Sequence, residues 1–553
     1  MPDLDLPQPI PTADWRDGAV YQIYPRSFAD SDGNGVGDLQ GMIDHLDHLG
    51  PDGLGVDAVW LSPFYPSPGH DLGYDVADHT RVDPLFGSEA DFDRLVDACH
   101  TRGLRVIIDL VMNHTSDEHE WFRQSRTSRE GPYADYYLWR DPSGWDAAGN
   151  PLPPNNWVSF FGGSGWEFEP ARQQFYYHTF LVQQPELNWR NPAVEADQWA
   201  MVRGWLERGV DGFRLDVFNA FLKDPGLRDN PVLPEGSSPW ARLEHKNDLD
   251  HADFADLIAR FRAIVDGYAD RMSVGELFSG GTPAAARYTS GRHIVFDWSL
   301  IEAPWTAAAF TAAIQSREEA YGPDRSPTVA LSNHDRERQA GRLAASVGRE
   351  ADSDAIARAA AVLQFGLRGT PFLYYGEEIG MVDVMIPDDE IVDPPARLAG
   401  PDFPWYDRSR CRTPMQWTAG PGAGFTSRTP WLRIAPDTDA RNVAAQRGDP
   451  GSVLETYRRL LAARRESPAL RVGRHDWIAT GQRDVLAWSR TAGRECRLVV
   501  INFAGSDRDI VVDTAGDAWT PVAGSQPDPA PVAQDGRLHL RADEAVIFRP
   551  ATV

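Results

Sequence analysis

Cysteine, basic charge and long apolar runs are all scarce in this chain of 553 residues. The three cysteines, Cys99, Cys411 and Cys496, are odd in number and far apart, which argues against a disulfide framework and against a cysteine-based metal site. Only 54 Lys and Arg stand against 81 Asp and Glu, and the net charge of −27 disfavours nucleic acid and anionic membranes as partners. No run of about 18 apolar residues occurs, so the sequence predicts no membrane span.

The N-terminal stretch, residues 1–11, also lacks the basic start and the apolar core of a secretory signal. We therefore expect a cytoplasmic protein. The hydrophobic fraction of 42% is ordinary for a globular chain that buries a large core. The acidic balance suits a neutral substrate such as a sugar, and we expect a monomer or a weak homodimer.

Eight short apolar runs alternate with segments of helical character. Strands that are buried on both faces have such continuous apolar sequences, as in parallel sheets. Eight of them alternating with helices predict an α/β fold, a (β/α)8 barrel. The predicted strands are 19–24, 57–62, 105–111, 210–215, 272–275, 293–298, 328–332 and 371–376.

Two stretches depart from this alternation. Residues 114–190 are rich in Trp, Tyr, Pro, Asn and Gly and predict a subdomain inserted after the third strand. Short β-like runs with turn signals predict a C-terminal antiparallel β-sandwich over 472–553. The catalytic barrel is then expected over 1–113 and 191–471.

Three acidic residues, Asp216, Glu276 and Asp335, come at the ends of predicted strands. One such acid is often only a turn residue or a helix N-cap. Three in succession indicate chemistry instead, because carboxylates at strand ends face the mouth of a parallel barrel. Arg214 shares a strand face with Asp216 and can keep it ionised. His334 adjoins Asp335 and can donate to a sugar hydroxyl.

These residues belong to motifs that follow one another along the chain. The set resembles the four motifs of the α-amylase superfamily of glycoside hydrolases, in its oligo-1,6-glucosidase and α-glucosidase branch, and the resemblance runs from about Trp15 to the C-terminus. A fifth motif, Gln-Pro-Glu-Leu-Asn at 184–188, has Glu where the family usually has Asp. The four are Asp-Leu-Val-Met-Asn-His (109–114), Gly-Phe-Arg-Leu-Asp (212–216), Gly-Glu (275–276) and Asn-His-Asp (333–335).

The resemblance implies Asp216 as nucleophile, Glu276 as acid/base and Asp335 as transition-state stabiliser. Retaining glycoside hydrolysis uses two carboxyl groups about 5–5.5 Å apart. The acid must hold its proton near neutral pH, and the nearby charge of Asp216 would raise the pKa of Glu276.

The same resemblance implies a pocket that admits only the end of a sugar chain. Asp71 would accept a hydrogen bond from the 4-hydroxyl of the non-reducing glucose, and Tyr74 would stack on its ring. Arg412 matches the arginine that pairs with this Asp. His114 and His334 match two histidines that contact the same sugar. Without the resemblance, the segment around Asp71 would be interpreted as a Gly-rich turn.

Four further residues are expected to bind substrate or to set its linkage. These are Phe161, Phe180 and Gln184 of the insertion, and Val217. In the resembled branch, Val after the nucleophile accompanies α-1,6 cleavage and Thr accompanies α-1,4 cleavage. We therefore expect release of glucose from the non-reducing end of short α-glucosides, with α-1,6 links favoured and α-1,4 links also accepted.

Two other functions compete with this hypothesis. An α-glucosyltransferase or isomerase of the same family, of the trehalose or isomaltulose synthase type, would use the same intermediate. Such isomerases tend to carry an Arg-rich loop, and only Arg336 and Arg338 suggest one here. A catalytically dead binding homologue would lack the three acids that this chain has.

The acidic run 30–38 (Asp-Ser-Asp-Gly-Asn-Gly-Val-Gly-Asp) has the first part of an EF-hand spacing. Its twelfth position is Gly41 instead of Glu, so it is not a complete EF-hand. A loop at this place binds a divalent cation in the resembled branch, and the alternative is a plain acidic turn. We expect a structural Ca²⁺, which Mg²⁺ could replace. The predicted ligands are Asp30, Asp32, Asn34, Val36 through its carbonyl, and Asp38.

Overall fold

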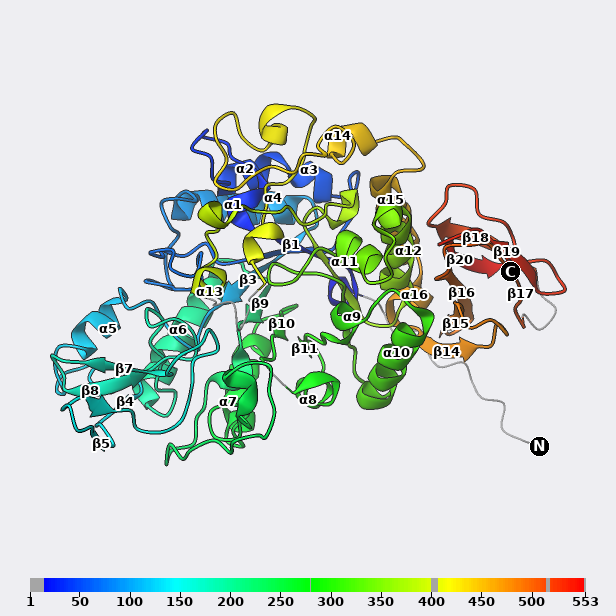
Figure 1. The fold of residues 1–553 in the computed structure, drawn as a ribbon. Coiled ribbons are helices and arrows are strands. Elements are labelled where there is room, and N and C mark those ends of the chain that lie inside the picture. Colours follow the sequence, from blue (N-terminus) through cyan, green and yellow to red (C-terminus); the bar gives the residue numbers. More distant parts are fainter. Residues whose placement is uncertain (1–13, 279, 399–405, 514–517, 552–553) are drawn as a thin grey trace.

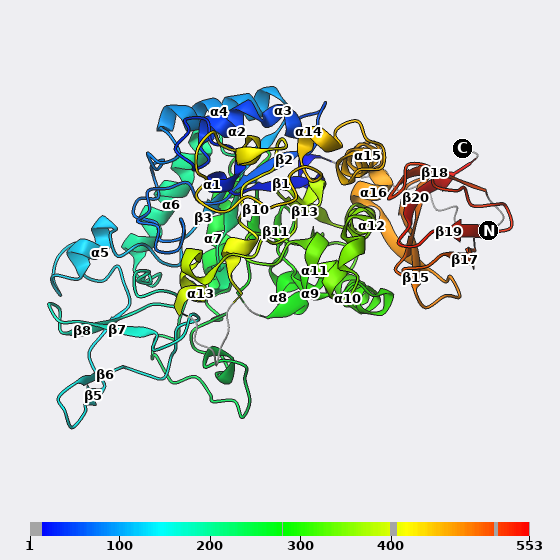
Figure 2. The same cartoon turned by 45° about the horizontal axis from the view of Figure 1, so that its top comes forward.

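The computed structural model describes residues 14–278, 280–398, 406–513 and 518–551. A barrel of eight parallel strands lies at the centre of the molecule. The inserted segment lies at one end and the C-terminal sheets at the opposite end (Figures 1 and 2). The predicted fold class is therefore confirmed, whereas the residue limits of the three domains stay predictions.

All eight predicted barrel strands are present. Their order around the barrel is β11-β10-β9-β3-β2-β1-β13-β12, and every paired neighbour is parallel. They are β1 (Val20–Ile23), β2 (Ala58–Leu61), β3 (Arg105–Leu110), β9 (Gly212–Leu215), β10 (Met272–Gly275), β11 (His293–Val295), β12 (Thr328–Ala330) and β13 (Thr370–Tyr374).

The seam between β11 and β12 is bridged by a side chain. The hydroxyl of Thr328 donates to the carbonyl oxygen of Val295 at 3.3 Å and accepts from the amide of Asp297 at 3.0 Å. These two bonds replace part of a backbone ladder between the two strands. The barrel is nearly closed as a result.

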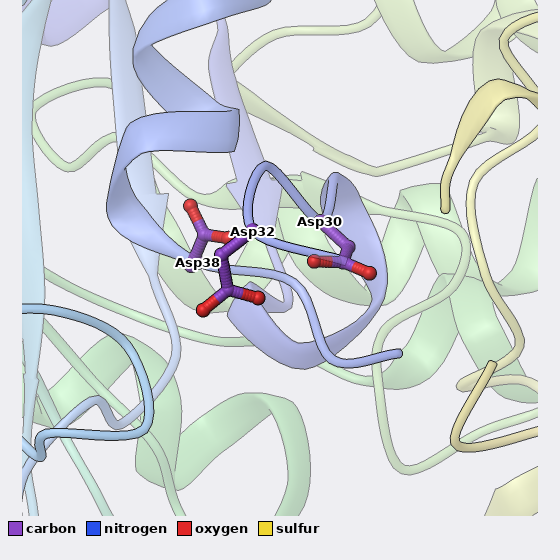
Figure 3. A group of neighbouring side chains, drawn as sticks. All are labelled: Asp30, Asp32 and Asp38. Carbon is purple, nitrogen blue, oxygen red and sulfur yellow. The ribbon is translucent and has the colours of Figure 1, made fainter. Parts of the chain in front are cut away.

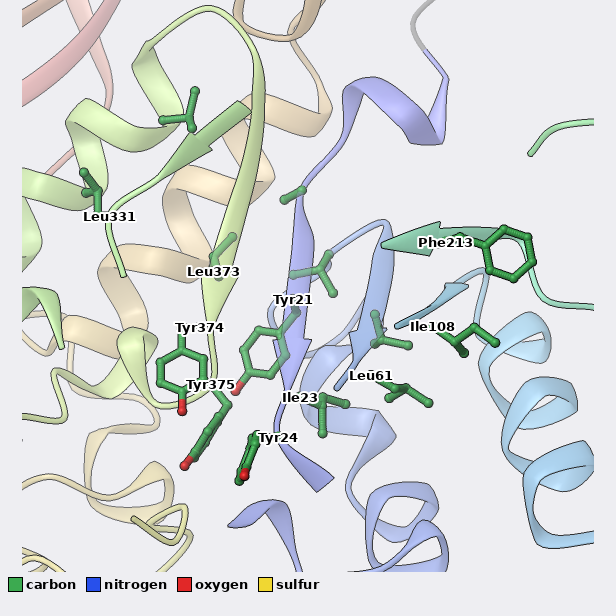
Figure 4. Packing of buried hydrophobic residues seen from close by; sticks show 14 of the residues in the cluster. Tyr21, Ile23, Tyr24, Leu61, Ile108, Phe213, Leu331, Leu373, Tyr374 and Tyr375 are labelled. Carbon is green, nitrogen blue, oxygen red and sulfur yellow. The ribbon is translucent and has the colours of Figure 1, made fainter. Parts of the chain in front are cut away.

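The strands are buried on both faces because successive side chains point to opposite sides. In β1, Val20 belongs to the apolar cluster inside the barrel, and Tyr21 belongs to the larger cluster that the surrounding helices cover. Ile107 and Ile108 of β3 divide in the same way. Figure 4 shows the outward-facing side chains of neighbouring strands packed side by side. This double burial explains why the strands lack an alternating polar pattern.

Most of the helices surround the barrel, whereas the one over Glu120–Ser125 lies in the inserted segment. Their bounds are α1 (Pro25–Phe28), α2 (Leu39–Asp44), α3 (Leu46–Leu49), α4 (Glu89–Thr101), α5 (Glu120–Ser125), α6 (Pro192–Glu207), α7 (Phe254–Asp266), α8 (Gly281–Tyr288), α9 (Ser299–Glu302), α10 (Ala307–Tyr321), α11 (Gln339–Ala345), α12 (Ser353–Gly366), α13 (Pro394–Leu398), α14 (Val443–Gln446), α15 (Val453–Arg465) and α16 (Pro468–Val472). Within the described ranges, none of them has the length and apolar character that a membrane span requires.

The inserted segment contains a small antiparallel sheet of order β4-β8-β7 and a separate hairpin, β5–β6. Aromatic side chains fill it, with Trp157, Trp166 and Tyr177 in one buried cluster. The composition of this segment therefore reflects a core of its own. The strands are β4 (Trp139–Arg140), β5 (Gly144–Trp145), β6 (Pro151–Leu152), β7 (Trp166–Glu169) and β8 (Gln174–Tyr177).

The C-terminal part is a two-layer antiparallel structure. A five-stranded sheet of order β14-β15-β16-β20-β18 shares an apolar core with the two-stranded sheet β17–β19. Leu538 and Leu540 of the small sheet belong to the same cluster as Val500 and Val546 of the large one. The strands are β14 (Arg474–Ile478), β15 (Val485–Ala492), β16 (Glu495–Asn502), β17 (Arg508–Val511), β18 (Trp519–Gly524), β19 (Arg537–Leu540) and β20 (Ala545–Pro550).

Gly366, at the end of α12, packs closely against this sheet. Its carbonyl oxygen accepts from the Trp488 indole at 3.1 Å, and a Cβ placed on Gly366 would lie 2.9 Å from a methyl group of Val499. Gly366→Ala is therefore expected to lower the free energy of unfolding by about 1–3 kcal/mol through overpacking. Denaturant unfolding measures the change.

The matched control is Gly204→Ala on α6, because a Cβ there would meet no atom within 4 Å. This change should be neutral or should stabilise the protein by up to about 1 kcal/mol through helix propensity. Equal effects of the two substitutions would contradict the close packing at Gly366.

Candidate active site

Two neighbouring strands bring two of the predicted acids side by side. Leu215 of β9 and Gly275 of β10 are register partners, so the next residues, Asp216 and Glu276, leave the barrel at the same level. The amide of Glu276 donates to the carbonyl oxygen of Leu215 at 2.9 Å, which continues the ladder past the strand ends. Asp335 follows β12 on the same face of the barrel and lines the same cavity.

The guanidinium of Arg214 connects these carboxylates. Its Nη1 atom lies 2.7 Å from Oδ1 of Asp216 and 2.7 Å from Oδ1 of Asp109, and its Nη2 atom lies 2.5 Å from Oε2 of Glu276. Asp109 and Arg214 are register partners on β3 and β9. The Arg214 side chain is 1% exposed, and its guanidinium lies over the Trp60 ring. One buried cation therefore holds three acids from three adjacent strands.

The three candidate catalytic acids differ in how tightly they hold a proton. Burial raises the pKa of Glu276 to about 8 and that of Asp216 to about 7, and Arg214 opposes both increases. For Asp335, burial is outweighed by the guanidinium groups of Arg412 and Arg408, which both donate to its carboxylate and hold its pKa far below the usual range. Glu276 is thus the acid that keeps its proton to the highest pH, and Asp335 stays ionised.

His334 lies in a hydrogen-bond chain behind the cavity wall. Burial lowers its pKa well below the ordinary value, so the ring is neutral. Gln22 donates to its Nδ1 atom at 2.7 Å, which leaves the proton on Nε2, 2.6 Å from the Tyr74 hydroxyl and 3.0 Å from the Asp335 carboxylate. Tyr74 donates in turn to Asp109 at 3.1 Å. The chain orients Asp335 and links it to the Arg214 cluster.

The far end of the site is closed by a second arginine cluster. Arg408 Nη2 donates to Asp71 at 2.7 Å, and its Nη1 donates to Asp335 at 3.1 Å. Asp393, which is fully buried, accepts from Nε, Nη2 and the backbone amide of Arg408. Arg408 is thereby fixed between two carboxylates that line the cavity.

The expected pairing of Arg412 with Asp71 is wrong. Arg412 donates instead to Asp335 at 2.7 Å and to the carbonyl oxygen of His334 at 2.7 Å, and its guanidinium lies over the Tyr24 ring. Both arginines donate to Asp335, and it is Arg408, in the short 3-10 turn Arg408–Arg410, that also donates to Asp71. The two arginines are close in the sequence, and the motif alone did not distinguish them.

The inserted segment contributes the fifth motif to this end of the site. Gln184 is fully buried and donates to Asp71 at 3.1 Å, and its side chain also lies 3.1 Å from His114 Nε2. His114 Nε2 lies 3.0 Å from the carbonyl oxygen of Tyr74. Burial lowers the pKa of His114 to about 3, so this histidine is neutral. Gln184 therefore supports Asp71 and His114 from behind.

These groups surround one cavity of about 520 Å³. Four of the predicted catalytic and substrate-binding residues lie behind the cavity wall and form hydrogen bonds with residues that line it: Gln184, Arg214, His334 and Arg412. The others line it directly: Asp71, Tyr74, His114, Phe161, Phe180, Asp216, Val217, Glu276 and Asp335.

Several lining residues were not predicted from the sequence. They are Arg408 at the far end and further aromatic and charged residues, which include Phe160, Phe278, Trp298, Glu302 and Arg336. No motif identifies them, because most come from loops that follow the barrel strands at irregular distances. The sequence prediction included Phe161 but not its neighbour Phe160, although both line the cavity.

Val217 occupies a conformation that is rare for a β-branched residue. Its φ and ψ angles are +35° and +42°, in the left-handed region. Its backbone amide faces the Glu276 carboxylate, with 3.4 Å between N and Oε2, and its side chain lines the cavity. This strained residue directly follows Asp216 and faces Glu276, the two carboxylates on Arg214.

Comparisons with known proteins agree with this geometry. The family model described as "Alpha amylase, catalytic domain" matches residues 22–473. The chain belongs to the α-amylase family. It is 42% identical over 506 residues to a probable alpha-glucosidase of Rhizobium meliloti (strain 1021), with 89% of each chain covered. It is 35% identical over 549 residues to an oligo-1,6-glucosidase of Heyndrickxia coagulans, with 93% of this chain and 96% of that protein covered.

Among solved structures, the fold resembles the alpha-glucosyl transfer enzyme XgtA. The TM-score is 0.88 at 39% identity, over 97% of this chain and 99% of that one. The recognition of an α-amylase family enzyme, a glycoside hydrolase, is therefore confirmed. The α-amylase fold also explains why the site lies at the carboxyl ends of the barrel strands.

In this α-amylase family chain, the acidic loop gathers three of the five predicted metal ligands. One oxygen each of Asp30, Asp32 and Asp38 lies within 4.8 Å of the others (Figure 3). Asp30 also accepts from the amides of Gly33 and Gly35, which hold the loop in a tight turn. Three carboxylates with hard oxygen donors fit Ca²⁺ or Mg²⁺.

Two of the predicted ligands also make hydrogen bonds within or beside the loop. The amide oxygen of Asn34 accepts from the backbone N–H of Val36 at 2.8 Å. Asp38 also accepts from the amide of Gly41 and so caps α2. The loop therefore combines a cluster of carboxylates with a helix cap.

Glu276→Gln is expected to stabilise the folded protein, and more so at pH 8 than at about pH 5. The pKa of Glu276 rises from 4.5 to about 8 on folding, so the folded state binds the proton more tightly and wild-type stability falls across this range as the pH rises. Gln cannot ionise and escapes this loss. The free energy of unfolding at pH 8 should increase by about 1–3 kcal/mol, measured by urea unfolding.

The control for this prediction is Glu302→Gln, which neutralises an exposed acid on the same cavity. It should leave the difference between the two pH values unchanged. An equal effect of Glu276→Gln at both pH values would contradict burial of its carboxyl in the protonated form.

Proposed function

We propose that this chain is a retaining, exo-acting α-glucosidase that hydrolyses short α-glucosides from the non-reducing end. The closed far end of the cavity carries the proposal, because Arg408 joins Asp71 to Asp335 beside the carboxylates on Arg214. Such a buried, ion-paired floor would stop a sugar chain from continuing past its terminal residue. The names alpha-glucosidase and oligo-1,6-glucosidase among the relatives support the same activity.

The proposed first step forms a covalent glucosyl–enzyme. The Asp216 carboxylate attacks the anomeric carbon while Glu276 gives its proton to the departing glycosidic oxygen. Arg214 stabilises the ionised form of Asp216 before the attack, and burial keeps the proton on Glu276. The proposed step requires Asp216 to be ionised while Glu276 still holds its proton, which is the order of their pKa values.

The second step hydrolyses that intermediate. Glu276, now ionised, takes a proton from a water molecule that attacks the anomeric carbon, and Asp216 departs as a carboxylate. Two displacements at the same carbon retain the α configuration. Asp335 stays ionised beside Arg408 and Arg412 and is proposed to stabilise the positive charge that develops on the sugar ring.

The linkage preference is proposed from Val217, which lines the cavity next to both carboxylates. Its presence favours α-1,6 links, with α-1,4 links also accepted. The alternative is glucosyl transfer or isomerisation, which would use the same intermediate. The resemblance to an alpha-glucosyl transfer enzyme supports this alternative. Of the two arginines that suggested an isomerase loop, only Arg336 lines the cavity; Arg338 is buried and donates to Tyr375.

The wild-type enzyme is expected to release glucose from isomaltose faster than from maltose and to leave amylose almost intact. Product analysis on isomaltose, maltose, sucrose and trehalose tests this, and a sugar isomer formed from sucrose would favour the alternative. A rapid fall in amylose viscosity with little free glucose would refute the exo-acting pocket.

Asp216→Asn should retain less than about 1% of the turnover of an aryl α-glucoside, since it removes the nucleophile's charge.

We also propose that the 30–38 loop binds a structural Ca²⁺, with Mg²⁺ as the competing ion. The three gathered carboxylates support this, and the ion would neutralise part of their mutual repulsion. The cytoplasmic location and the state as monomer or weak homodimer stay predictions from the sequence. A neutral oligosaccharide is the only partner that the proposal requires.

Removal of divalent ions is expected to lower the melting temperature of the enzyme. An ion that binds only the folded state stabilises it by about 2.7 kcal/mol at a concentration of 100 times its Kd. Asp32→Asn should abolish the dependence on added Ca²⁺, whereas Asp52→Asn, a surface change outside the loop, should keep it. Unchanged stability and no bound metal in the wild-type enzyme after dialysis against Ca²⁺ would identify the loop as an ordinary turn.

A further inference from the structure

A buried ion pair joins the inserted segment to the loop that follows the nucleophile. The ammonium group of Lys223 contacts Oε1 of Glu186, and the two side chains are 2% and 1% exposed. Glu186 is the residue of the fifth motif at which this chain departs from the usual Asp. Neither residue lines the main cavity.

Each end of the pair is anchored to a different part of the site. Lys223 also donates to the carbonyl oxygen of Ala220, the last residue of the 3-10 turn Phe218–Ala220. Glu186 uses its second oxygen to accept from the backbone amide and the hydroxyl of Thr179. The pair therefore ties the turn after β9 to the sheet of the inserted segment.

This turn begins at the strained residue of the site. The carbonyl oxygen of Val217 accepts from the amide of Ala220 at 2.9 Å, and the amide of Phe218 donates to the carbonyl oxygen of Glu276 at 3.1 Å. A left-handed, β-branched residue persists only where its surroundings hold it. Lys223 fixes the far end of the same turn and so contributes to the position of the Val217 amide on the Glu276 carboxylate.

Stability alone is a weak reason for such a pair. Two charges lose their hydration when they are buried, and apolar residues of similar volume often replace a buried pair without loss of stability. The pair does supply a directional contact to one backbone oxygen that an apolar side chain cannot make. Its geometry is thus better suited to fixing the turn than to strengthening the core.

We infer that Lys223 and Glu186 are positioning residues for the proposed acid/base, holding the Val217–Ala220 turn so that the Val217 amide stays on the Glu276 carboxylate. The inference rests on the proposed function, since it concerns the same carboxylate. Lys223 and Glu186 act only through the turn and do not touch the substrate.

The pH profile reports this role. Arg214, Asp216 and Asp335 also face Glu276, and the Val217 amide favours the ionised form of its carboxyl. If the amide moves away, the proton is held to higher pH, so the alkaline limb of kcat/KM should move up by roughly half a pH unit. Hydrolysis of isomaltose should fall more than hydrolysis of an activated aryl glucoside, whose leaving group needs no proton.

The decisive variant is the double change Lys223→Met with Glu186→Gln. Lys223→Met alone would leave a buried, unpaired carboxylate and could prevent folding. The double variant removes both charges at nearly constant volume and should keep a melting temperature close to wild type. It should still lose about tenfold in kcat/KM on isomaltose, with the shifted alkaline limb.

Arg126→Met is the matched control, because it breaks an ion pair of the inserted segment, with Glu169, that does not reach the turn. Its pH profile should equal that of the wild type. Suppose that the wild-type enzyme is active and that the folded double variant has the same pH profile and the same activity on isomaltose. This result would overturn the positioning role and leave the proposed function standing. A wild-type enzyme without α-glucosidase activity would instead overturn the proposed function, and this inference with it.

Discussion

The charge cluster around Arg214 is the constraint on which the rest of the site depends. Three carboxylates from β3, β9 and β10 converge on one buried guanidinium, and each would repel the others without it. Arg214 is planar and permanently charged, so it can bind several carboxylates at fixed angles. The strand register that aligns Asp109 with Arg214, and Leu215 with Gly275, brings these groups together. The barrel is thus the frame for one electrostatic cluster.

A second cluster repeats the same principle at the far end. Arg408 is surrounded by Asp71, Asp335 and Asp393, and Arg412 adds a further cation on Asp335. The two clusters produce opposite results, because Asp335 has several cations near it, whereas Glu276 shares one with two other acids. One acid stays ionised and the other holds its proton. Acids in a single cavity are thereby prepared for different tasks.

The inserted segment completes a site that the barrel alone would leave open. Gln184 supports Asp71, and Phe161 and Phe180 form part of the wall. The segment has an aromatic core of its own, which allows it to hold these side chains rigidly. Its position at one end of the barrel (Figure 1), away from the C-terminal sheets, leaves those sheets outside the site. They pack instead on the helices, through contacts such as Trp488 on Gly366.

The sequence alone identified the barrel and the three acids that line its cavity. Short continuous apolar runs are typical of strands that are buried on both faces, and Asp216, Glu276 and Asp335 follow such runs within recognisable motifs. Only the tertiary structure decided which arginine pairs with Asp71, because Arg408 and Arg412 lie in one short segment and both donate to Asp335, while Arg408 also donates to Asp71. The sequence likewise did not predict that Phe278 and Trp298 line the cavity, because irregular loops have no periodic sequence pattern. Local sequence patterns predict helices and strands, because these have a regular repeat. Contacts between residues far apart in the sequence depend on distances that only the folded structure determines.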